Sequence, residues 1–162
     1  MTENSIASWL SGRLPDDWFT EQPEVTVDRD EILVVGRLAA TDGGPDAEAG
    51  RIARFRDDTR DKRIAIAREA EHRFERKVAW GATCGDTTKV FTTLSVPVMT
   101  RLRQPERRVL DTLVDAGVAR SRSDALAWAV RLVGKHTEDW LDQLRTAMAD
   151  VERVRAAGPE TA

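Results

Sequence analysis

The chain has 162 residues, of which 41% are hydrophobic, and its 25 Lys and Arg against 28 Asp and Glu give a net charge of −3. This length suits one ordinary domain or two small ones. The sequence holds no apolar run of about 18 residues, so we expect no membrane span, and its start lacks the pattern of a secretory signal. One cysteine and two histidines exclude an internal disulfide framework and disfavour a metal site. We therefore expect a cytoplasmic protein that needs no cofactor.

The first 97 residues predict a small α+β domain. Residues 5–23 indicate a short helix and a turn, and we expect their two tryptophans and one phenylalanine to pack in the core of the adjacent fold. Residues 24–40 predict a β-hairpin, because 24–27 alternate with period two and 32–35 form a continuous apolar strand.

Residues 47–75 predict one long helix, since apolar residues recur at helical spacing among charges of both signs. Arg56, Arg60 and Arg63 fall on one side of this helix. We interpret this basic stripe as a solvated face joined by ion pairs, and a nucleic-acid contact is the lesser alternative.

Strand character returns after the long helix. Residues 77–80 and 89–94 are strand-like and flank a turn at 85–86. The first part therefore reads β-β-α-β-β. Its role stays open, and sensing of a ligand or binding of a protein partner are both compatible with it.

The sequence shows no recognisable catalytic arrangement. Cys84 stands near a turn without a neighbour in sequence that would lower its pKa, so we interpret it as a packed residue. A group of acids and one histidine shares the long helix, but no nucleophile or orienting partner accompanies it. These residues are Glu69, Glu71, His72 and Glu75. The sequence therefore predicts no enzyme.

The second part of the chain has a more regular pattern. Residues 98–103 alternate and predict a strand, and Pro105 then suits the first turn of a helix that Gly117 ends. Ser121 can cap a second helix by accepting a hydrogen bond from the amide of Asp124, whose side chain can reach back.

This order of strand, helix, glycine-ended loop and serine-capped helix, over residues 100–133, resembles the ribbon-helix-helix (MetJ/Arc-like) DNA-binding domain. The resemblance is carried by Leu-Asp-Thr-Leu-Val-Asp-Ala-Gly at 110–117 and by Ser-Arg-Ser-Asp-Ala-Leu at 121–126. It covers about one fifth of the chain. It implies an obligate homodimer, in which one strand from each copy pairs into an antiparallel ribbon that enters the major groove of double-stranded DNA.

The resemblance also assigns candidate DNA contacts. The alternation over 98–103 turns the odd-numbered residues outward, where Arg101 is the best candidate to pair with guanine. The free amides at the start of the second helix suit a backbone phosphate. A solvated edge strand and simple helix capping are the alternative interpretations of these arginines and serines. The predicted DNA-binding residues are Met99, Arg101, Arg103, Ser121, Arg122 and Ser123.

The position of the strand and the charge balance leave alternatives. Residues 89–97 are a second candidate for the ribbon, and we prefer 98–103 because the earlier choice leaves a long helix interrupted by Pro105. Residues 99–136 hold eight Arg or Lys and four Asp or Glu, a net charge of +4, which leaves −7 for the rest. The local positive charge suits a directed DNA contact, while the acidic remainder weakens nonspecific binding.

Three regions are therefore predicted: the α+β domain at 1–97, the ribbon-helix-helix unit at 98–136, and a C-terminal helix and tail at 137–162. The leading function is a dimeric, sequence-specific DNA-binding regulator of transcription. The alternative is a module that binds a protein or a ribonucleoprotein through tryptophan-bearing faces and uses the ribbon-helix-helix unit only to dimerise. One side of the C-terminal helix is apolar and carries Trp140, Leu141, Leu144, Met148, Val151 and Val154.

Overall fold

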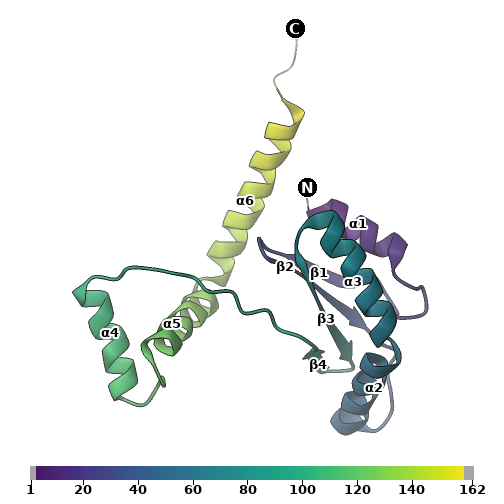
Figure 1. The fold of residues 1–162 in the computed structure, drawn as a ribbon, viewed down its shortest axis with the longest axis horizontal. Coiled ribbons are helices and arrows are strands. Elements are labelled where there is room, and N and C mark those ends of the chain that lie inside the picture. The colour runs from purple at the N-terminus through teal and green to yellow at the C-terminus, as the bar shows by residue number, and fades with distance from the viewer. Residues whose placement is uncertain (1–2, 159–162) are drawn as a thin grey trace. The chain divides into compact units, whose positions relative to one another are not determined.

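Two units make up the part of the chain that the structure, a computed structural model, describes: residues 3–158. The division falls between Val98 and Met99. The first unit contains α1 (Glu3–Arg13), β1 (Glu24–Val27), β2 (Glu31–Arg37), α2 (Gly44–Asp58), α3 (Arg60–Phe74), β3 (Lys77–Cys84) and β4 (Thr87–Val90) (Figure 1). The second contains α4 (Gln104–Asp115), α5 (Arg122–His136) and α6 (Glu138–Ala157). The predicted α+β class is confirmed, with one four-stranded sheet and six helices among the described residues.

The sheet has the strand order β1-β2-β3-β4. Its outer pairs are antiparallel and its central pair, β2 with β3, is parallel, with Ile32 opposite Val78. The parallel pair follows from the connection, since α2 and α3 carry the chain back to the starting end of the sheet. The predicted turn between β1 and β2 is confirmed: the Asp28 carboxylate accepts hydrogen bonds from the amides of Asp30 and Glu31 at 2.8 and 2.7 Å.

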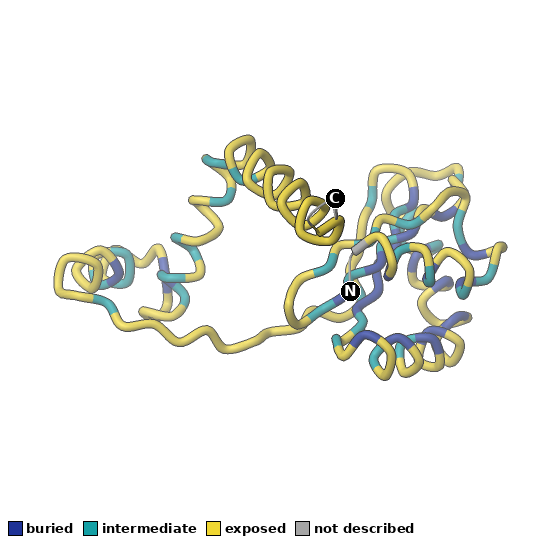
Figure 2. Tube along the Cα trace, turned by 90° about the horizontal axis from the view of Figure 1, so that it is seen from above, coloured by how far each residue is buried: buried dark blue, intermediate teal, exposed yellow. Residues whose placement is uncertain are grey.

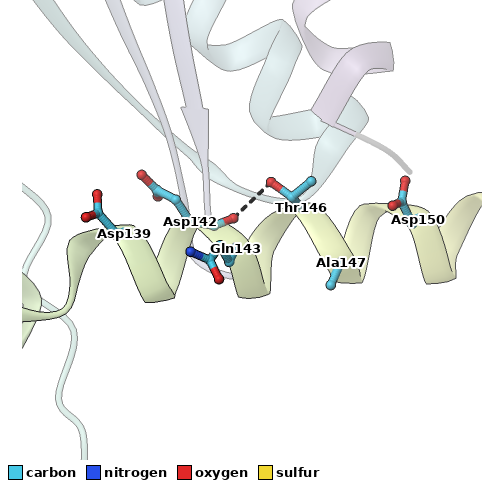
Figure 3. A pocket seen from close by; sticks show the side chains of 6 residues that line it. All are labelled: Asp139, Asp142, Gln143, Thr146, Ala147 and Asp150. Carbon is cyan, nitrogen blue, oxygen red and sulfur yellow. Dashed lines mark hydrogen bonds between the residues drawn. The ribbon is translucent and has the colours of Figure 1, made fainter.

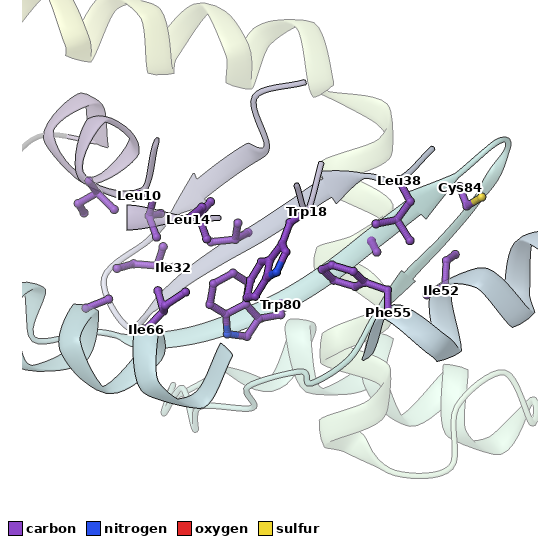
Figure 4. Packing of buried hydrophobic residues seen from close by; sticks show 14 of the residues in the cluster. Leu10, Leu14, Trp18, Ile32, Leu38, Ile52, Phe55, Ile66, Trp80 and Cys84 are labelled. Atoms are coloured by element: carbon purple, nitrogen blue, oxygen red, sulfur yellow. The ribbon is translucent and has the colours of Figure 1, made fainter. Parts of the chain in front are cut away.

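The core of the first unit lies between the sheet and helices α1, α2 and α3 (Figure 4). Alternate residues of the central strands supply one side, and the helices supply the other. The most deeply buried of these side chains are Ile6, Leu10, Ile32, Val34, Ile52, Ile66 and Cys84.

Aromatic residues fill the middle of this core. Trp18 packs edge-on against Phe55 and Trp80, with ring centroids 5.6 and 6.1 Å apart. Phe19 occupies the space that a side chain at Gly36 would need, because a Cβ built there would lie 2.1 Å from its ring. The expectation that the aromatic residues of 5–23 pack in the core is confirmed.

The prediction of a single helix over 47–75 is wrong, because two helices, α2 and α3, occupy this range and are separated at Thr59. The Thr59 hydroxyl donates to the Phe55 carbonyl at 2.6 Å and accepts from the Arg63 guanidinium at 3.0 Å. A threonine side chain that bonds back to the preceding turn competes with the regular helix ladder and bends it.

The predicted solvated basic stripe is confirmed for Arg56 and Arg60, which are exposed, and is wrong for Arg63. Only 8% of this residue is exposed, and its guanidinium donates to the Arg56 carbonyl at 2.6 Å while lying 4.9 Å from the centre of the Phe91 ring. Burial lowers the pKa of Arg63, and the nearby charge of Arg56 adds to the shift. The side chain therefore joins α2, α3 and the end of the sheet instead of facing water.

The strand predicted over 89–94 is also corrected, because β4 ends at Val90. Phe91 makes one more bond to β3, since its amide donates to the Trp80 carbonyl at 2.7 Å, and its ring lies 6.3 Å from that of Phe55. The predicted strand therefore continues no further than this residue, whose side chain packs on the helices.

In the second unit, α4 and α5 form a helical hairpin around a small cluster, the hairpin core, made of Leu110, Ala119 and Ala125. The preceding segment, 92–103, takes an extended course with almost every residue exposed (Figure 2). The strand predicted over 98–103 is not formed within one copy, since the described chain places no neighbouring strand beside it. α6 follows α5 after the single residue Thr137.

No helix within residues 3–158 is both long enough and apolar enough to cross a lipid bilayer.

Candidate nucleic-acid interface

The segment that enters α4 has one face against the helices and one toward solvent. Leu102 is partly buried and packs on the hairpin core, whereas its neighbours Arg101 and Arg103 are exposed. Met99 is 96% exposed. The structure thus places the three outward candidates of the extended segment, Met99, Arg101 and Arg103, on accessible positions, with Leu102 inward between the two arginines.

The other two residues that the alternation predicts to face inward are exposed in a single copy. Val98 is 87% exposed, and Thr100 is exposed as well. These two positions share the parity of Leu102, and nothing within residues 3–158 covers them as the hairpin core covers Leu102.

The end of the extended segment is held by α4 itself. The Arg107 guanidinium donates to the Leu102 carbonyl at 2.8 Å, and the Arg107 amide donates to the Arg103 carbonyl at 3.0 Å. Sequence reasoning did not assign Arg107 a role. The signal was its position one turn after the last strand residue, where a long cation can reach back to an unpaired carbonyl.

Ser121 caps α5 as predicted. Its hydroxyl accepts a hydrogen bond from the Asp124 amide at 3.1 Å. The Asp124 carboxylate reaches back, but to the amide of Arg120, at 3.0 Å, rather than to that of Ser121. Two donors at the helix start are therefore satisfied by two short polar side chains, as in a capping box.

The Arg122 side chain is engaged inside the unit. Its guanidinium makes two hydrogen bonds to the Asp111 carboxylate, at 2.6 and 2.8 Å, and so ties the start of α5 to α4. These bonds hold the pKa of Asp111 below its usual range and raise that of Arg122. Asp111 was missed as a partner because the pairing spans the loop between the helices.

The backbone at the start of α5 remains available. The amides of Arg122 and Ser123 have no acceptor within residues 3–158, and Ser123 is exposed. Amides at a helix N-terminus together with the helix dipole form a favourable position for an anion. The structure thus brings Ser121, Arg122 and Ser123 together at one helix end, while the extended segment presents Met99, Arg101 and Arg103.

Two other kinds of candidate site are clusters of metal-binding side chains and exposed tryptophan faces. Among the described residues, no group of three or more His, Cys, Asp or Glu side chains is arranged to hold a metal ion. The expectation that tryptophans form exposed faces for protein binding is wrong in the first unit. Trp18 and Trp80 are buried there, and Trp9 packs against the same core. Trp140, in α6, is 59% exposed.

Two protein-family models match the chain on either side of the extended segment. The model described as "Rv1265-like protein, N-terminal domain" matches residues 4–90, which is more than half of the chain. The model described as "Mb1296 C-terminal domain" matches residues 103–155. The chain belongs to the Rv1265-like family.

Relatives of this Rv1265-like chain include "Uncharacterized protein Mb1296" of Mycobacterium bovis and "Uncharacterized protein Rv1265" of Mycobacterium tuberculosis. Each is 58% identical to it over 161 residues, which cover 97% of this chain and 71% of the relative. No solved structure matches the chain significantly. Residues 91–102 lie between the two matched ranges, while α4, α5 and most of α6 fall in one of them.

Proposed function

We propose that the chain is a homodimeric, sequence-specific DNA-binding protein that regulates transcription. In this proposal residues 98–103 of two copies pair as an antiparallel ribbon in the major groove, and the start of α5 binds a backbone phosphate. The observation that carries it is the alternation at the entry to α4, where Leu102 packs inward while Arg101 and Arg103 point away from the hairpin core.

Exposed apolar surface on the second unit supports the dimer. Val109, Val130 and Val133 are 58, 65 and 56% exposed, although they belong to helices that pack on each other. Exposed apolar side chains on both helices are available to an interface with a second copy. Two copies of the extended segment can also pair their backbone groups with each other, where a single exposed segment bonds to water.

Outward arginines on a ribbon account for sequence reading. A guanidinium can pair bidentately with the O6 and N7 atoms of guanine, so Arg101 is the proposed base reader. Arg103, next to α4, reads a base or contacts a phosphate. Met99 adds an apolar contact to the groove.

The start of α5 accounts for orientation on the DNA. The unpaired amides of Arg122 and Ser123 face a position that suits a phosphate oxygen. The Arg122 guanidinium contributes indirectly, because its bonds to Asp111 hold this helix end in place.

Two variants test the proposal in different ways. Arg101→Ala removes a base contact and should weaken binding to a preferred duplex by roughly 1–3 kcal/mol, with little effect on a scrambled duplex. Ser123→Glu places a carboxylate where the phosphate should lie, so it should weaken binding to both duplexes. The helix should survive, because an acid in its first turn is locally favourable.

The preferred duplex is selected from a random library with the wild-type protein, and binding is titrated by fluorescence anisotropy at two salt concentrations. Salt should alter the effect of Ser123→Glu and leave that of Arg101→Ala nearly unchanged. Arg54→Ala, an exposed arginine of α2, is the matched control and should bind as the wild type does. Binding of no duplex at low salt would remove the DNA proposal and leave the ribbon-helix-helix unit as a dimerisation device for an interaction module.

A further inference from the structure

Helix α6 is an amphipathic helix without a partner in its own unit. None of its described residues is buried (Figure 2). Its apolar side chains lie along one side, and their exposed fractions include 60% for Met148 and 69% for Val154. We call this surface the α6 stripe; it consists of Trp140, Leu141, Leu144, Met148, Val151 and Val154.

The opposite side of α6 is polar, and two of its carboxylates pair with arginines of the same helix. Figure 3 shows the side chains of Asp139, Asp142 and Asp150 projecting from the helix with that of Thr146, whose hydroxyl donates to the Asp142 carbonyl at 2.9 Å. At 100° per residue, the centre of this polar side lies well over a quarter turn from that of the α6 stripe. A helix with one apolar and one polar side buries only the apolar one.

The spacing of the α6 stripe fits helix pairing. Leu141, Leu144, Met148 and Val151 are separated by three, four and three residues, which are the a and d positions of two heptads. An isolated helix of this length in water is marginal, and helices in proteins gain most of their stability from packing an apolar face. The α6 stripe therefore needs a surface.

We propose that the α6 stripe of one copy packs in parallel against the α6 stripe of a second copy, so that α6 extends the dimer beyond the helical hairpin. This proposal rests on the homodimer of the proposed function. Only Thr137 separates α5 from α6, and its amide and hydroxyl both donate to the Val133 carbonyl, at 3.0 and 2.7 Å.

The short connection between α5 and α6 favours a second copy of the chain as the partner of the α6 stripe. Two hairpins that share a two-fold axis send their α6 helices away from the same interface, so each helix has the other at high effective concentration. The family match to residues 103–155 also places most of α6 in one domain with α4 and α5.

Charges beside the α6 stripe favour the parallel arrangement. In a fully overlapped antiparallel pair, Arg145 would face Arg145 of the second copy, and Glu138 would face Glu152 of the second copy. Both contacts would place like charges together. In a parallel pair, Arg145 of one copy instead lies beside Trp140 of the other, where a guanidinium and an indole attract each other.

The first test compares two double variants of the full-length chain by analytical ultracentrifugation. Leu144→Lys with Met148→Lys charges the α6 stripe, whereas Gln143→Lys with Ala149→Lys adds the same charge outside it. We expect the stripe variant to raise the dimer dissociation constant at least about tenfold over the control variant. The helical content of each variant, measured by circular dichroism, verifies that the second unit has folded, and the unfolding transition of the first unit verifies that the first has.

The second test measures orientation. Spin labels are placed on single cysteines introduced at Asp139 or at Arg153, near the two ends of α6; the natural Cys84 is fully buried. Parallel pairing predicts a short distance between equivalent labels at both ends, whereas antiparallel pairing predicts separations of about 20 Å along the axis.

The outcomes separate this inference from the proposed function. A wild-type chain that stays monomeric at micromolar concentration would overturn the homodimer, and the pairing of α6 with it. A wild-type dimer whose stripe variant associates as tightly as the control would overturn the α6 pairing alone. Long distances at both ends would overturn the parallel arrangement.

Discussion

The two units of this chain solve the burial of apolar surface in different ways. In the first, fifteen described side chains from the sheet and three helices form one buried cluster. In the second, the corresponding cluster has three buried members, Leu110, Ala119 and Ala125, while many apolar residues of its helices stay exposed. Both units have amphipathic elements, so they differ in how much of that apolar surface is buried within one copy.

This contrast leads to different expectations for the two units if the chain forms the proposed homodimer. Burial of a large core supplies the free energy of folding within one copy, so the stability of the first unit should not depend on protein concentration. The second unit exposes the surfaces that would complete its core. Its stability should therefore rise with concentration, as it does for any protein whose folded form binds a second copy.

The largest expected effect concerns the core of the first unit. Ile66→Ala should lower the free energy of unfolding of this unit by about 2–5 kcal/mol, because a side chain that is 1% exposed leaves a cavity when it is truncated. Denaturant unfolding of the full chain, followed by tryptophan fluorescence at two protein concentrations, measures this loss.

Ile64→Ala is the matched control, since Ile64 lies on the same helix with 36% of its surface exposed. It should cost less than about 1 kcal/mol. If dilution shifts the Ile66→Ala transition as strongly as it shifts that of the second unit, the contrast between the two units is wrong.

A smaller effect is expected at the start of α5. Ser121→Ala removes the acceptor for the Asp124 amide and should destabilise the second unit by about 1 kcal/mol. Ser123→Ala, two residues later, removes a hydroxyl that makes no hydrogen bond within residues 3–158 and should have almost no effect. Thermal unfolding of both variants at one protein concentration checks this, and equal losses would contradict the capping role.

The smallest expected effect is a dependence on pH. The bonds from Arg122 lower the pKa of Asp111 in the folded chain, so the carboxylate contributes stability above its unfolded pKa of about 3.9. That contribution is lost as the pH falls through the lowered folded pKa. The unfolding midpoint of the second unit should therefore drop on acidification, and less steeply in Asp111→Asn.

Asp115→Asn, on the same helix but without an ion pair among the described residues, is the control for this experiment. It should keep the acid dependence of the wild type. An acid dependence that is identical in the wild type and in Asp111→Asn would show that the pair with Arg122 does not stabilise the unit.

Local signals in the sequence were enough to predict most elements. Period-two alternation located β1, the continuous apolar run located β2, and Ser121 located the start of α5. The break at Thr59 was not predictable in the same way, because its cause is a set of hydrogen bonds that involves the buried Arg63. The end of β4 escaped prediction for a similar reason, since the pairing with β3 stops after Phe91, whose ring packs on side chains of α2 and α3.

The candidate site was predictable only where its geometry is local. The cap made by Ser121 depends on neighbours within three residues, and it has the expected form. The pairing of Arg122 with Asp111 spans eleven residues and a loop, so no spacing rule revealed it. A strand over 98–103 depends on a neighbouring strand that residues 3–158 of one copy do not place beside it, and it stays a prediction about the proposed dimer.

The parallel pairing of β2 with β3 has a consequence for how the first unit folds. Hairpins β1–β2 and β3–β4 join residues close in sequence, whereas the central pair joins Ile32 to Val78. The chain between them must close into a loop of about 45 residues before any hydrogen bond of that pair forms, and such closure is slow. We therefore expect the meeting of the two hairpins around α2 and α3 to limit the folding rate of the first unit, while the α4–α5 hairpin can form early from its local contacts.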